Sequence, residues 1–99
     1  MARFAVIRRH GPAWNAATPL REQAEWDSHA PFMDGLLADG FVELGGPLGD
    51  GSRVLLIVEA RDAEEIRDRL DTDPWTRLGL LVIESIDRWD VLLERHPED

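Results

Sequence analysis

Apolar residues recur along the chain in two patterns, as short runs and as positions spaced three or four residues apart. The runs predict β-strands over residues 3–9, 41–44, 54–60 and 80–86. The spaced positions predict helices over residues 19–39 and 62–70. The resulting order of strand, helix, strand, strand, helix and strand predicts one α+β domain over residues 1–99, with the ferredoxin-like βαββαβ arrangement, an antiparallel sheet and a frayed tail at residues 95–99.

The first predicted helix has a histidine on its apolar face. Five residues share that face on a 3.6-residue period: Trp26, His29, Met33, Leu36 and Leu37. Thr18 before Pro19 fits an N-cap followed by a proline in the first turn, and Gly40 fits a C-terminal stop. Pro31 lies inside the helix and lacks an N–H, which predicts a bend or an interruption near residues 27–29.

The third and fourth strands indicate that both faces of the sheet are covered. Residues 54–60 and 80–86 are apolar with little alternation, which is typical of strands buried on two sides. Two helices can cover only one face of a four-stranded sheet. The pattern therefore predicts a homodimer in which a second copy covers the other face around a two-fold axis.

A glycine-rich segment separates the second and third predicted strands. Gly45, Gly46, Pro47, Gly49 and Gly51 predict a hairpin turn in this segment. Glycine also allows the backbone to approach a ligand closely, so Gly46 and Pro47 are candidates for substrate binding. The segment does not match the nucleotide-binding pattern GxGxxG.

Composition excludes several classes of function. The net charge of -9 argues against nucleic acid or an anionic membrane as a partner. The chain has no Cys, Lys or Tyr, which excludes disulfides, thiolate chemistry and Schiff bases. Its three histidines lack metal-ligand spacing, and no cofactor motif is visible. No apolar stretch approaches the length of a signal peptide or a membrane span, so we expect a soluble cytoplasmic protein.

His29 and Asp73 are the candidates for proton transfer. Histidine is the usual proton-transfer group near neutral pH, but pattern alone favours a half-buried core histidine bonded to the backbone carbonyl that Pro31 frees. Asp73 could orient an imidazole, or it could simply be an N-cap before Pro74. Asp71 lies two residues earlier and competes for the same role.

Aromatic and basic residues give further candidates. Trp26 and Trp75 could wall an apolar pocket together with Met33, or they could be core or interface residues. Arg8 shares a strand face with Phe4 and Val6, so it could hold a substrate carboxylate, whereas the more common role is a surface arginine paired with an acid. The roles of Arg9 and His10 stay open.

Several of these motifs, in this order, resemble the YciI-like (YCII-related) family. They are His29 followed by Met33, Leu36 and Gly40, the turn Gly45-Gly46-Pro47-Leu48, Asp73-Pro74-Trp75, Gly79 and Trp89. The resemblance implies the dimeric α/β-barrel version of the ferredoxin-like fold and a His–Asp dyad as the active site, here His29 and Asp73. The family includes a dehydrochlorinase of a chlorinated hydroxyquinol. Arg8 and Arg9 lie in a less constant region and are not transferred as functional.

Two hypotheses of different classes follow. In the first, the protein is a small-molecule enzyme in which His29 moves a proton and Asp73 orients its ring. The reaction is then a cofactor-free elimination, isomerisation or cyclisation of a cyclic or aromatic substrate, and replacing either residue abolishes turnover with little effect on thermal stability. In the second, the same pocket binds a metabolite without turnover, or the dimer is an interaction module.

Overall fold

The predicted ferredoxin-like fold is confirmed by a computed structural model, which describes residues 1–95. Its elements, in chain order, are β1 (Ala2–His10), the 3-10 turn η1 (Leu20–Glu22), α1 (Trp26–Ala38), β2 (Val42–Leu48), β3 (Arg53–Ala60), α2 (Ala63–Leu70), α3 (Pro74–Arg77) and β4 (Leu81–Arg88). The strands form one antiparallel sheet in the order β2-β3-β1-β4. The frayed tail predicted for residues 95–99 lies, after Arg95, outside the described residues.

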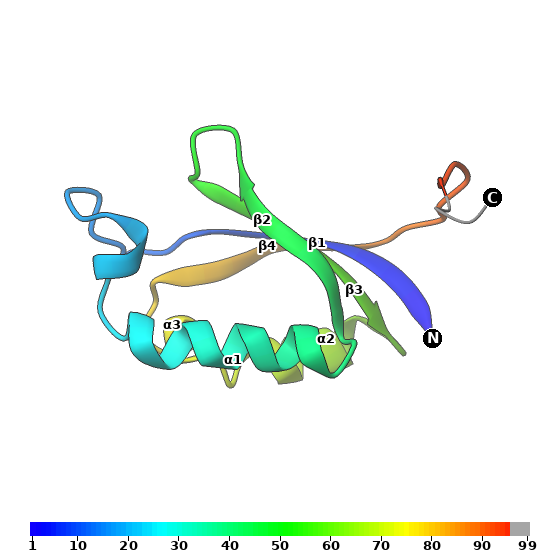
Figure 1. Cartoon of the computed structure of the whole chain (residues 1–99), viewed down its shortest axis with the longest axis horizontal. Coiled ribbons are helices and arrows are strands. Elements are labelled where there is room, and N and C mark those ends of the chain that lie inside the picture. The colour runs from blue at the N-terminus through cyan, green and yellow to red at the C-terminus, as the bar shows by residue number, and fades with distance from the viewer. Residues whose placement is uncertain (96–99) are drawn as a thin grey trace.

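The helices lie on one face of the sheet, and the core fills the space between the two layers (Figure 1). Inward-facing residues of the central strands, such as Val6 and Val58, pack against Ile66 and Leu70 of α2, and all four side chains are fully buried. A second, smaller cluster forms around Trp75, Leu80 and Leu81. The first cluster stabilises the fold, and the second supports the site described below.

The first helix begins later than its sequence predicts. Residues 20–22 form only a 3-10 turn, and α1 starts at Trp26 after Glu25, which has a positive φ of 61°. The reason is Gln23, whose buried side-chain amide donates to the carbonyls of Asn15 and Thr18 and so ties the preceding loop together. The expected stop at Gly40 is confirmed by its φ of 84°.

Pro31 does not interrupt α1, which is continuous from Trp26 to Ala38 (Figure 1). The expected interruption near residues 27–29 is therefore wrong. The missing N–H of Pro31 removes only the helical hydrogen bond to the carbonyl of Asp27, and the first turn forms normally, with the amides of Ser28 and His29 both donating to the carbonyl of Glu25.

The segment Gly45-Gly46-Pro47 belongs to β2 and is not a hairpin turn, so that prediction is wrong. Pro47 pairs with Val54, and the actual turn follows Leu48. A proline fits here because β2 is an edge strand, where one side of the backbone needs no ladder partner. The turn uses Gly49 and Gly51, both with positive φ.

The loop after β1 is fixed to the end of α3 by a close approach of two glycines. The amide of Gly11 donates to the carbonyl of Leu80 over 2.8 Å, and the amide of Ala13 donates to the carbonyl of Gly79 over 3.0 Å. A Cβ at Gly11 would overlap the Gly79 carbonyl. This contact holds Trp14 beside the second cluster.

We expect Gly11→Ala to lower the free energy of unfolding by about 1–3 kcal/mol, because the new methyl group must displace backbone. Gly35→Ala is the matched control: it lies in α1 with open space around its Cβ, and should gain up to about 1 kcal/mol from helix propensity. Urea denaturation measures both. Equal stabilities for the two variants would contradict the proposed tight contact.

Candidate active site

Asp73 is a helix cap and a partner of His29 at the same time. Its side chain accepts a hydrogen bond from the Trp75 amide over 3.0 Å, and Pro74 occupies the first position of α3. This is the capping role that the Asp-Pro sequence suggests. The cap fixes the carboxylate in a fully buried position facing α1. Both interpretations of this residue therefore describe the same geometry, whereas Asp71 is exposed.

His29 extends from α1 to the carboxylate of Asp73. Its Nδ1 lies 2.9 Å from Oδ1 and 3.0 Å from Oδ2, and the residue is 8% exposed. The indole of Trp75 stacks on the imidazole with centroids 3.8 Å apart and planes 3° from parallel. Trp75 is itself anchored, since its Nε1 donates to the carbonyl of Ala24 over 2.7 Å. The imidazole is thus held at its edge and over its face.

Arg8 completes the buried cluster and is not the surface arginine that its type suggests. The side chain is 1% exposed, its Nη1 lies 3.0 Å from Asp73 Oδ2, and its Nη2 donates to Thr76 Oγ1 over 2.6 Å. Within residues 1–95 its buried Nε has no hydrogen-bond partner. The sequence signal for this placement is alternation, because Arg8 follows Phe4 and Val6 on the core-facing side of β1.

Electrostatics keep Asp73 ionised. Burial by itself would raise the pKa of Asp73, but the hydrogen bonds from His29 and the Trp75 amide and the charge of Arg8 outweigh it and lower that pKa. Burial lowers the pKa of Arg8, and Asp73 opposes the change, so the guanidinium stays charged near neutral pH. An ionised carboxylate only accepts hydrogen bonds, so Nδ1 of His29 carries a proton, and in the neutral form of the imidazole Nε2 is the acceptor.

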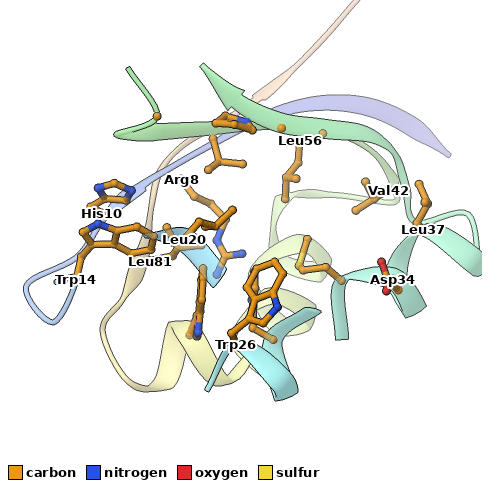
Figure 2. A pocket seen from close by; sticks show the side chains of 18 of the residues that line it. Arg8, His10, Trp14, Leu20, Trp26, Asp34, Leu37, Val42, Leu56 and Leu81 are labelled. Atoms are coloured by element: carbon orange, nitrogen blue, oxygen red, sulfur yellow. The ribbon is translucent and has the colours of Figure 1, made fainter. Parts of the chain in front are cut away.

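The cluster lies at the wall of a cavity of about 540 Å³ between the sheet and the helices. Figure 2 shows this space between the strands that carry Arg8 and Leu56 and the helical side, from which Trp26 projects. All of the residues predicted to contact a substrate line it: Trp26, His29, Met33, Gly46, Pro47 and Trp75. Most other lining residues are apolar, as in small-molecule sites.

Sequence reasoning assigned no role to two further lining residues, His10 and Trp14. Their rings stack with centroids 3.8 Å apart. Arg9, the neighbour of His10, is exposed, and Trp89 lies after β4 and does not line the cavity. The alternation of β1 could have indicated His10, which falls on the same face as Arg8.

Two features are absent from residues 1–95. No group of three or more His, Cys, Asp or Glu side chains is arranged to hold a metal ion. No helix there combines the length and the apolar character that a membrane crossing requires.

Comparison with known proteins shows a similarity at the level of structure. No family model matches the chain, and no curated protein matches it by sequence. Among solved structures, the chain is similar to 5-chloro-2-hydroxyhydroquinone dehydrochlorinase (TftG) from Burkholderia phenoliruptrix AC1100, in complex with 2,5-dihydroxybenzoquinone. The identity is 26%, the match covers 88% of this chain and 93% of that one, and the TM-score is 0.59. The neighbour is thus an enzyme with a ring compound as ligand.

The ion pair changes the expected stability of an Asp73 variant. Asp73→Asn keeps the shape of the side chain but leaves Arg8 as an uncompensated buried charge. We therefore expect the free energy of unfolding to fall by about 3–5 kcal/mol. The double variant Arg8→Met/Asp73→Asn removes that charge and should recover most of the loss. Urea denaturation of both variants checks this, and a double variant as unstable as the single one would contradict it.

The free energy of unfolding should also depend on pH, and the lowered pKa of Asp73 fixes the direction of the change. Because the folded-state pKa of Asp73 is lowered, its contribution is present above the unfolded value of about 3.9 and is lost as pH falls through the folded value. Wild-type stability should therefore fall below about pH 4, and this fall should be shallower in the double variant.

Proposed function

We propose that this protein is a small-molecule enzyme in which His29 transfers a proton to or from a hydroxylated six-membered ring bound in the cavity. The observation that carries the proposal is the buried pair of His29 and Asp73 at the wall of a largely apolar cavity. A buried imidazole with one nitrogen bonded to a carboxylate and the other free is the arrangement that general base catalysis uses.

Each residue of the cluster has a separate role. His29 Nε2 accepts the proton from a ring hydroxyl, while Asp73 holds Nδ1–H and stabilises the imidazolium that forms. Arg8 is a positioning residue, since it binds Asp73 and Thr76 from the opposite side and fixes the carboxylate. Trp75 limits the imidazole to one plane. The apolar lining excludes water and strengthens these interactions.

The similarity to the dehydrochlorinase favours elimination among the reactions open to such a site. When a chlorinated hydroxyhydroquinone loses HCl, one hydroxyl proton moves to the carbon that bears chlorine, which makes the neighbouring C–O group a ketone. A second hydroxyl proton then goes to the base, chloride leaves with the electron pair of the C–Cl bond, and the ring becomes a hydroxyquinone in which that carbon carries hydrogen. The ring is oxidised by loss of its own chloride, so the step needs no external oxidant. We propose this cofactor-free class of reaction for the chain.

The test is turnover of 5-chloro-2-hydroxyhydroquinone, measured as the amount of chloride released. His29→Gln preserves a hydrogen bond to Asp73 but cannot take a proton at neutral pH, so we expect a loss of about 10²–10⁴-fold in kcat. Ser28→Ala, on the exposed side of the same helix, is the control and should retain full activity. Turnover by the variant at the wild-type rate would refute the role of His29. Binding without turnover by wild type would favour a metabolite-binding module.

We propose further that two copies associate through the sheet face opposite the helices. By register, Ile7 of β1, Leu55 of β3 and Leu44 of β2 lie on this face with exposed surface, whereas Ile57, the partner of Leu44, is already buried in the single chain. Leu44 is 62% exposed in the single chain. The helices cover only the other face (Figure 1). A two-fold dimer would bury this apolar surface, which a small domain otherwise exposes to water.

Leu44→Glu should convert such a dimer to a monomer, because it would place two carboxylates in an apolar interface. Analytical ultracentrifugation of wild type should give twice the mass of one chain. Leu78→Glu is the control, since Leu78 is also exposed but lies at the end of α3, away from this face. A monomeric wild type would refute the dimer.

A further inference from the structure

A second imidazole lies in the same cavity as His29. His10 ends β1, two residues after Arg8, so both side chains fall on the cavity side of the sheet. Figure 2 shows His10 against Trp14 at one end of the cavity, with Trp26 and Asp34 farther along it. The proposed reaction leaves His10 without a role.

The two imidazoles are joined by a continuous aromatic wall. His10 stacks on Trp14 at 3.8 Å, Trp14 meets Trp75 edge-on at 5.5 Å, and Trp75 stacks on His29 at 3.8 Å. Each imidazole is thus fixed parallel to an indole, and the two indoles lie between them. A flat ligand that contacts both imidazoles would lie along this wall.

The surroundings of His10 suit a neutral hydrogen-bonding partner. Burial lowers the pKa of His10, and the charge of Asp50 and a hydrogen-bonding contact with the Gly51 backbone oppose this only in part. Arg8 is already paired with Asp73, while Asp34 and Asp50 also line the cavity. These two carboxylates disfavour a carboxylate on the ligand, which leaves an uncharged hydroxyl or quinone oxygen as the partner of His10.

We propose that His10 is a specificity-determining residue that hydrogen-bonds an oxygen at the far end of the substrate, and that the substrate is a flat, hydroxylated compound of two fused six-membered rings. This inference rests on the proposed function, because it places the reacting ring at His29. The cavity volume of about 540 Å³ is more than a single hydroxylated ring fills. It falls within the range of roughly 300–1,000 Å³ that holds larger ligands.

The test compares two probes of equal ring size by quenching of the fluorescence of the cavity tryptophans. One probe, 5,8-dihydroxy-1,4-naphthoquinone, has oxygens on both rings, and the other, 1,4-naphthoquinone, has them on one. Because the chain has neither Cys nor Lys, covalent addition of these side chains to the quinones does not interfere. His10→Phe keeps the stack on Trp14 and removes both ring nitrogens.

We expect wild type to bind the dihydroxy probe about tenfold more tightly than 1,4-naphthoquinone, the value of one hydrogen bond of roughly 1.4 kcal/mol. His10→Phe should lose this preference while leaving the Kd of 1,4-naphthoquinone within about twofold. His10→Gln, whose amide can form a hydrogen bond, should restore part of the preference for the dihydroxy probe. It takes the place of His10→Phe in the test if that variant fails to fold. The proposal would be overturned if His10→Phe changed the Kd of both probes equally or of neither, or if wild type bound neither probe.

The result is separable from the test of catalysis, because it measures binding and not turnover. A His29→Gln variant that retains activity would refute the role of His29 and leave the His10 preference standing. A preference unaffected by His10→Phe, in a protein whose turnover depends on His29, would refute only this inference.

Discussion

A guanidinium and a carboxylate, both shielded from solvent, lie 3.0 Å apart between β1 and α3. Removing either charge alone would leave the other buried and uncompensated, which costs several kcal/mol in a domain of this size. Arg8 and Asp73 must therefore be retained or replaced together. The position of the His29 ring depends on this pair, because the carboxylate that binds the imidazole is the one that Arg8 holds.

The local chemistry of the chain around Asp73 explains how one carboxylate can serve three partners. As the N-cap of α3 it accepts from the Trp75 amide, and this bond sets the direction of the side chain. This bond uses Oδ1, Arg8 lies at Oδ2, and Nδ1 of His29 is within hydrogen-bond distance of both oxygens. The residue that donates to the cap, Trp75, also stacks on the imidazole. A four-residue helix thus supplies both the carboxylate and the aromatic support of the site.

The site lies at the junction of the two parts of the core. The larger cluster between the sheet and α2 fixes β1 and β3, and the smaller one around Trp75 fixes α3 and the loop that carries Trp14. The cavity opens between them, and most of the side chains that line it are apolar.

Local pattern was sufficient for the order of the elements and for the candidates His29 and Asp73, because alternation, helical spacing and the Asp-Pro cap act over only a few residues. It failed at the start of α1, where Gln23 bonds a loop five to eight residues earlier in the chain, and at Pro47, whose place in β2 depends on an edge that exists only in the assembled sheet. Only the tertiary structure brought His29 to Asp73 across 44 positions, buried Arg8 behind them and set His10 against Trp14. These contacts join segments that are distant in sequence, so no local preference could specify them.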